Sequence, residues 1–212
     1  MKILFALLFA AIALTHLISL CFGRPRLQNV TKACLLPLLL VVYLLSAESL
    51  RLTIILAMAF GWGGDILLIK INNKTFFQLG LGCFLLGHIC YILSLLMFTP
   101  TVHFTALVIS CIAAIPVGII FLKIVHPDKA MMIPVIAYSV ILESMVICAL
   151  QFLLNQGGII GAAVFGGSLC FMASDSLLAY FTFQKIPKYG NILVMFTYIL
   201  AQTGLVLGLA YM

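Results

Sequence analysis

Four ionisable side chains lie inside strongly apolar stretches of the sequence, where charge is costly. They are Asp65, His88, Glu143 and Asp175. An ionised group at the centre of a bilayer costs about 2.5–3.5 kcal/mol on insertion scales, so each is a candidate functional residue. Two carboxyl groups in apolar surroundings can divide the roles of general acid and general base. The pair Asp65 and Asp175 therefore points to acid–base chemistry inside a membrane.

The composition requires a membrane setting. Of the 212 residues, 65% are hydrophobic and only 8% are charged, against about a quarter charged in soluble domains. A spanning helix needs about 20 apolar residues. We therefore predict an all-α, polytopic integral membrane protein, with a single domain of eight transmembrane helices over residues 1–212. The predicted helices lie near residues 3–22, 31–47, 51–69, 76–98, 103–124, 130–152, 158–183 and 190–211.

The positive charges predict the orientation. If the spans alternate, nine of the eleven Lys and Arg residues fall on one side, and only Lys2 and Arg51 fall on the other. The positive-inside rule then makes both termini non-cytoplasmic. The net charge of +6 is spread too thinly for a nucleic-acid-binding patch, so no nucleic-acid partner is expected.

The first 22 residues are interpreted as a retained span, because their apolar stretch is long for a signal peptide and no small-residue cleavage site follows. The seven cysteines contain no CxxC pair and indicate neither a disulfide framework nor a zinc site. No cofactor or metal is expected. The short connections favour a bacterial inner membrane, and the oligomeric state is left open.

Helical spacing groups the polar residues on common faces. At about 1.5 Å per residue, Asp65 lies about 7.5 Å and Asp175 about 15 Å from the cytoplasmic edge, with His88 and Glu143 near the midplane. The predicted inward faces are Gly80, Phe84, His88 and Tyr91; Asn191, Tyr198 and Gln202; and Ser139 with Glu143. Asp65 and Asp175 are 110 positions apart, as are His88 and Tyr198. Spans three and four could thus correspond to spans seven and eight as a parallel repeat, a plan known from transporters.

Structural explanations compete for the same residues. Asp65 could be a helix-end carboxylate that is wetted by the cytoplasm and paired with Lys70 or Lys74. Asp175 could have a purely structural partner. His88 and Glu143 could each hydrogen-bond a neighbouring helix. The run at 61–64, Gly-Trp-Gly-Gly, favours close helix packing over a phosphate cradle, and His16, His103 and His126 receive no role.

Four segments in order resemble the YhhN family of membrane proteins, which includes the lysoplasmalogenases. They are GDILL at 64–68, FLLGHICY at 84–91, FMASDSLLA at 171–179 and TYILAQ at 197–202. Tyr138 with Met145 is similar to a weaker signature. The resemblance runs from about Lys32 to the C-terminus, and Glu143 departs from the family pattern.

The resemblance implies an eight-helix enzyme that cleaves the vinyl ether of lysoplasmalogens to a fatty aldehyde and glycerophospho-ethanolamine or -choline. It also implies that Asp65 and Asp175 are the acidic positions. Vinyl ether hydrolysis requires protonation of the alkene carbon, and a second carboxylate can stabilise the cation and activate water. We expect Asp175 to be the acid and Asp65 the base, with His88 and Tyr198 orienting water or the carboxylates.

Other residues are expected to contact the lysophospholipid substrate, which with the membrane lipids is the expected partner. They are Lys70, Lys74, Lys185, Lys188, Asn191, Gln202, Glu143 and Tyr91. The four lysines could instead be ordinary interfacial anchors, but as a rim they would attract the phosphate. Two other functions stay open. One is a proton-coupled small-molecule or lipid transporter or binding protein, and the other is a hydrolase with zinc held by His88, the two aspartates and Glu143.

Overall fold

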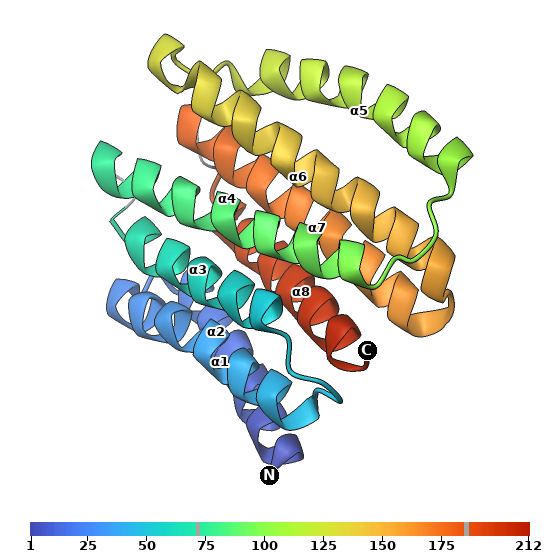
Figure 1. The fold of residues 1–212 in the computed structure, drawn as a ribbon. Coiled ribbons are helices and arrows are strands. Elements are labelled where there is room, and N and C mark those ends of the chain that lie inside the picture. The colour runs from blue at the N-terminus through green and yellow to red at the C-terminus, as the bar shows by residue number, and fades with distance from the viewer. Residues whose placement is uncertain (71–72, 185–186) are drawn as a thin grey trace. The chain divides into compact units, whose positions relative to one another are not determined.

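The computed structural model describes residues 1–70, 73–184 and 187–212, and these residues form eight α-helices (Figure 1). The helices are α1 Lys2–Cys21, α2 Pro25–Ser46, α3 Leu52–Leu68, α4 Lys74–Met97, α5 Phe104–Val125, α6 Lys129–Gln156, α7 Gly158–Phe183 and α8 Gly190–Ala210. Each predicted apolar run is helical, so the all-α prediction is confirmed. Seven of these helices are long and apolar enough to cross a membrane, while the apolar α3 is shorter, with 17 residues.

The largest boundary difference is at the start of α2. The apolar pattern predicts a start at residue 31, whereas the helix begins at Pro25. Proline suits the first helical position, because its φ is already helical and its missing N–H needs no partner there. Polar residues follow Pro25, so the hydropathy pattern does not reveal this first turn and a half of the helix. As a result, Lys32 lies about two turns inside α2 and not at its edge.

The chain divides by its internal contacts into two compact units. Unit 1 comprises Met1–Ser94 and Val206–Met212, and unit 2 comprises Leu95–Leu205. In unit 1, α2 packs against α1 and α3, and in unit 2, α6 packs against α5 and α7. The corner between α6 and α7 is made by Gly157 and Gly158 with φ of +63° and +55°, a region that glycine adopts without steric cost.

The glycine run on α3 packs closely against α4 within unit 1. A Cβ added to Gly64 would lie 2.6 Å from the Phe84 ring, and one added to Gly87 would lie 3.2 Å from the Ala57 carbonyl oxygen. Small residues allow such close approach between apolar helices. The prediction of close helix packing for this run is confirmed.

Contacts inside unit 1 recur inside unit 2 at positions 110 residues further along the chain. The matching contacts are Thr53–Ser94 with Ala163–Gly204, Gly64–Phe84 with Ser174–Val194, and Tyr43–Arg51 with Leu153–Gly161. The first two pairs join α3 with α4 and α7 with α8. The third joins α2 to Arg51, the residue before α3, and α6 to α7. The packing therefore supports the predicted repeat and extends it to α2 and α6.

The contact between α7 and α8 depends on Gly167 of α7 and Gly204 of α8, and this gives a first testable prediction. A Cβ on Gly167 would lie 2.8 Å from the Leu205 backbone nitrogen, whereas one on Gly166 would meet nothing within 4 Å. Because backbone atoms cannot move aside cheaply, Gly167→Ala is expected to lower the melting temperature in detergent by several degrees. Gly166→Ala is the matched control: its methyl group meets open space, so it should keep the melting temperature or raise it slightly. Equal melting temperatures for both variants would contradict the close contact.

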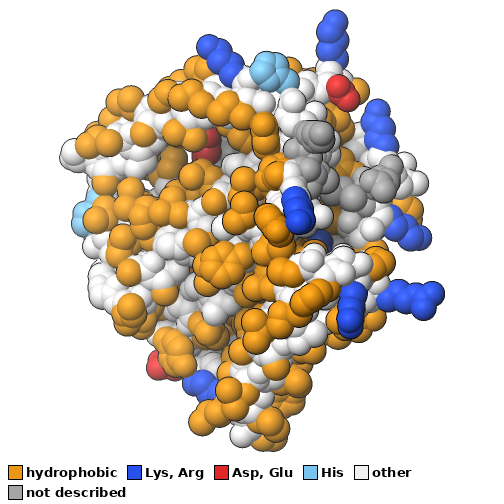
Figure 2. All heavy atoms as spheres, turned by 180° about the vertical axis from the view of Figure 1, so that it is seen from behind, with side chains coloured by type: hydrophobic (Ala, Val, Ile, Leu, Met, Phe, Trp, Pro, Cys, Tyr) orange, Lys and Arg blue, Asp and Glu red, His pale blue; other side chains and the backbone are white. Residues whose placement is uncertain are grey.

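Large hydrophobic side chains are exposed along most helices. Figure 2 shows them over most of one face, with few charged side chains between them. Helix α5 contributes only Val125 to the buried residues. Contiguous apolar surface of this extent is rare on soluble monomers, whereas it suits helices that face lipid.

Candidate functional site

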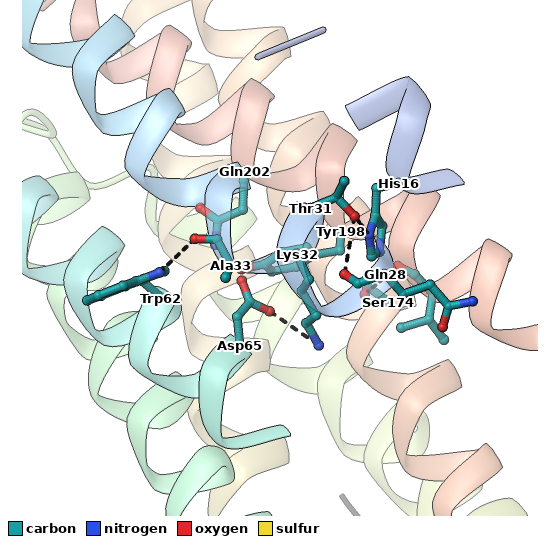
Figure 3. A network of polar contacts seen from close by, with 11 residues as sticks. His16, Gln28, Thr31, Lys32, Ala33, Trp62, Asp65, Ser174, Tyr198 and Gln202 are labelled. Atoms are coloured by element: carbon teal, nitrogen blue, oxygen red, sulfur yellow. Dashed lines mark hydrogen bonds and ion pairs between the residues drawn. The ribbon is translucent and has the colours of Figure 1, made fainter. Parts of the chain in front are cut away.

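Asp65 forms a buried ion pair between α3 and α2 (Figure 3). Its Oδ1 lies 3.5 Å from Lys32 Nζ, and the side chains of Lys32 and Asp65 are 20% and 2% exposed. A buried carboxylate needs a counter-charge, because desolvation otherwise outweighs what the charge gains. Lys32 supplies it. On the same face of α3, the Trp62 indole donates to the Ala33 carbonyl oxygen at 2.9 Å and fixes α3 against α2.

The wetted helix-end interpretation of Asp65 is wrong. The carboxylate is buried, and its ion pair among the described residues is with Lys32 and not with Lys70 or Lys74. Lys70 is exposed, and its ammonium lies over the Phe76 ring at 4.9 Å from the centroid. The physical reason is the early start of α2, which brings Lys32 to the depth of Asp65.

Beside Lys32, a polar cluster that the sequence interpretation missed joins α1 to α2 (Figure 3). The Thr31 hydroxyl donates to the Leu27 carbonyl oxygen at 2.7 Å, so its Oγ1 accepts from His16 Nδ1 at 2.8 Å. Gln28 Nε2 donates to the Ser19 carbonyl oxygen at 3.0 Å. The signal was present in the sequence. His16 with Thr31, and Ser19 with Gln28, lie at matching distances on either side of the turn that follows α1.

His88 and Tyr91 lie on the buried face of α4, as predicted. Both are 1% exposed, and Gly80 and Phe84 on the same stripe are also buried. His88 Nδ1 donates to the Phe84 carbonyl oxygen at 2.6 Å. This bond fixes the ring and assigns the proton to Nδ1, because a carbonyl oxygen can only accept.

In unit 2, Asp175 on α7 has a phenol as its partner. Tyr138 on α6 donates its hydroxyl to Asp175 Oδ2. Asp175 is half-buried, whereas Tyr138 is buried. Next to it, the Ser174 hydroxyl donates to the Val194 carbonyl oxygen at 3.0 Å and ties α7 to α8. The two aspartates thus share a pattern: each is bound to the preceding helix of its own unit, one by an ammonium and the other by a phenol.

The inward face predicted for α8 is confirmed for two of its three residues. Tyr198 and Gln202 are buried; the Gln202 amide donates to the Tyr198 hydroxyl at 3.5 Å, and the Tyr198 ring meets Phe171 edge-on at 5.6 Å. For Asn191 the prediction is wrong, because this residue is exposed. It is the second residue of α8, one turn before Val194, the first hydrophobic residue of this helix that is buried.

Glu143 lines a cavity of about 200 Å³ between α5, α6 and α7. Except for Glu143 and Ser110, the lining is apolar. Within the described part of the chain, Glu143 makes no hydrogen bond or ion pair to another helix. The interpretation that it hydrogen-bonds a neighbouring helix is therefore not supported.

The lysines of the predicted phosphate rim are exposed where the structure describes them. These are Lys70, Lys74 and Lys188, and Lys188 Nζ lies 5.3 Å from the centroid of the Tyr189 ring. Lys185 lies outside the described residues. Among residues 1–70, 73–184 and 187–212, no three His, Cys, Asp or Glu side chains are grouped closely enough to hold a metal ion.

Comparison with known families adds one finding to this geometry. The family model described as the YhhN family matches residues 27–209, which is most of the chain and includes both aspartates and their partners. Of the polar cluster, His16 and Ser19 on α1 lie outside the matched region. No curated protein and no solved structure gives a match.

Proposed function

The chain belongs to the YhhN family, and from this premise we propose that it is a lysoplasmalogenase, a membrane hydrolase of the vinyl ether of lysoplasmalogens. The products are a fatty aldehyde and a glycerophospho-ethanolamine or -choline. The observation that carries the proposal is the pair of aspartates at equivalent positions of the repeat, with different partners. Asp65 faces the ammonium of Lys32, and Asp175 accepts from the neutral phenol of Tyr138.

These partners support the division of roles. An ammonium stabilises an ionised carboxylate, whereas a phenol bonds a carboxyl group in either state. Asp175 gives its proton to the terminal alkene carbon, and the double-bond electrons form the new C–H bond and leave an oxocarbenium ion. Asp65 stabilises this cation and takes a proton from the water that attacks it. The hemiacetal then collapses to the aldehyde, and its hydroxyl proton passes to the leaving glycerol oxygen. The proton that Asp65 took from water returns through water to Asp175, which restores both carboxyl groups to their starting states.

The repeat also relates the directions of the helices that carry the two acids. If all eight helices cross the membrane, residues 110 positions apart are on helices of the same direction. With the positive-inside orientation, both termini are non-cytoplasmic and the acids lie in the cytoplasmic half of a bacterial inner membrane. The exposed lysines attract the phosphate of the lysolipid.

One assay tests the proposal. Purified protein in detergent is incubated with alkenyl- and acyl-lysophospholipids side by side, and both aldehyde and fatty acid are measured. We expect aldehyde from the alkenyl lipid and no fatty acid from the acyl lipid. Fatty acid alone would make the protein an ester hydrolase. The absence of both products would contradict hydrolysis. A chelator added to the same assay separates acid–base catalysis from zinc-dependent catalysis, since only the latter loses activity.

The repeat favours transport as the second candidate function. Parallel repeats with buried ionisable residues occur in transporters, where the site lies at the repeat interface. Transport needs two compartments, whereas hydrolysis proceeds in detergent. Proton-coupled uptake of lysolipid by vesicles, without any aldehyde release by the same protein in detergent, would favour this candidate.

A further inference from the structure

The cavity lined by Glu143 lies on the same two helices as the pair of Asp175 and Tyr138. On α7, Met172 lines the cavity and is three positions before Asp175, so the two residues are neighbours on the helix surface. On α6, Glu143 is five positions after Tyr138, a rise of about 7.5 Å. These helices run in opposite directions from a tight corner (Figure 1). Both counts therefore place the cavity on the same side of the pair, away from the helix ends that carry exposed lysines.

The cavity is apolar and open on one side. Ala113 and Val117 on α5 line it and are themselves exposed, so the opening faces lipid if α5 crosses the membrane. The Ser110 hydroxyl donates to the Ala106 carbonyl oxygen of its own helix at 2.7 Å. Glu143 has no counter-charge among the described residues, and a lone carboxylate in apolar surroundings is costly, so it faces the cavity as a neutral carboxyl group. Such a lining suits a hydrocarbon chain, which needs no polar partner.

We propose that this cavity holds the alkenyl chain of the lysolipid while its vinyl ether lies at Asp175. The inference rests on the proposed function and adds the site of the chain to it. From Asp175 to Phe165, which lines the cavity, α7 rises by about 15 Å over ten residues. This is half of the hydrocarbon core of a bilayer, the room that one lipid chain occupies. The head group then remains towards the exposed lysines, and the chain enters sideways from the lipid.

The size of the cavity fits a section of such a chain. A cavity of about 150 Å³ holds the carbon atoms of benzene, and this one has about 200 Å³. It therefore encloses the part of the chain that follows the vinyl ether, and the rest continues into lipid through the open side. A long chain should bind better than one that ends inside the cavity, because a longer chain makes more packing contacts.

Chain binding is measured with a lipid that has no vinyl ether to cleave. A hexadecyl ether lysophospholipid with a diazirine in the middle of the chain is mixed with the purified full-length protein in detergent. After irradiation, the cross-linked residues are identified by mass spectrometry. We expect cross-links around Val117 on α5 and Ile147 on α6, and at least a tenfold decrease with excess unlabelled hexadecyl lipid but a smaller one with the octyl lipid. Cross-links that are spread over all helices and resist competition would overturn the proposal.

Two variants test the space itself. Ala114→Phe places a ring at a residue that lines the cavity and should reduce the competed cross-links by at least about tenfold. Cys111→Phe adds the same ring at an exposed position of α5 that does not line the cavity and should keep them. Equal cross-linking of the two variants would overturn the proposal. If Ala114→Phe does not fold, the positions and the competition of the wild-type cross-links decide.

The aldehyde assay separates this inference from the proposed function. Competed cross-links in the cavity without aldehyde release would support the chain site and contradict hydrolysis. Aldehyde release with the competed cross-links elsewhere would keep hydrolysis and overturn the cavity as the site of the chain.

Discussion

Asp175→Asn is expected to reduce fatty aldehyde release from an alkenyl-lysophospholipid by at least about 100-fold, the lower range for loss of a general acid. The amide keeps the shape of the carboxyl group and can still accept the Tyr138 hydrogen bond. It has no acidic proton to give to the alkene carbon. The protein should therefore fold and extract normally while kcat falls and KM changes little. Aldehyde release is followed over time with saturating substrate.

Two further variants show whether this loss is specific. Asp128→Asn changes an exposed aspartate before α6 in the same way and should leave the rate unchanged. Tyr138→Phe removes the phenol from Asp175 and should lower the rate by only about tenfold, because the acid remains. Asp175→Asn with full activity would remove Asp175 from the mechanism, whatever the other two variants show.

Lys32→Met is expected to destabilise unit 1. It removes the ammonium from a carboxylate that is 2% exposed, and loss of one partner from a buried pair costs about 3–5 kcal/mol. The Lys32 side chain is itself 20% exposed, so water replaces part of its stabilising effect. We therefore expect the free energy of unfolding to fall by about 3 kcal/mol or less. Thermal unfolding in detergent measures it, with Lys129→Met as the control at an exposed lysine.

The double variant Lys32→Met with Asp65→Asn tests the ion pair itself. Once the carboxylate is neutral it no longer needs a counter-charge, so the double variant should be more stable than Lys32→Met alone. It should also be inactive, since the base is gone. Additive losses in the double variant would mean that Lys32 stabilises the helices by packing and not through Asp65.

The helices were predictable because lipid-facing segments must be apolar over their whole length, and every predicted run is helical. The ends were less predictable where polar residues continue a helix. The turn and a half after Pro25 carries arginine and glutamine, so hydropathy alone cannot reveal it. The last turn of α6 likewise continues past residue 152 through Asn155 to Gln156, until Gly157 adopts a positive φ.

Within the candidate site, the choice of buried acids and of the His88 face followed from periodicity and the cost of burying charge. The partners of these residues could not be predicted in this way. Lys32 and Tyr138 are 33 and 37 positions before their aspartates, and contacts at that separation depend on helix register, which hydropathy does not determine. The repeat is the exception. A spacing of 110 noticed at two pairs of residues also relates three contacts among α2–α4 to three among α6–α8.

Unit 1 contains residues from both ends of the sequence. The Glu48 backbone N–H donates to the Ala210 carbonyl oxygen at 3.1 Å, and Lys2 Nζ lies 4.9 Å from the centroid of the Tyr211 ring. On the ribosome, residues 206–212 are made only after all of residues 95–205. Residues 1–94, which enter the translocon first, therefore form only an incomplete unit 1 until the rest of the chain has been synthesised and inserted.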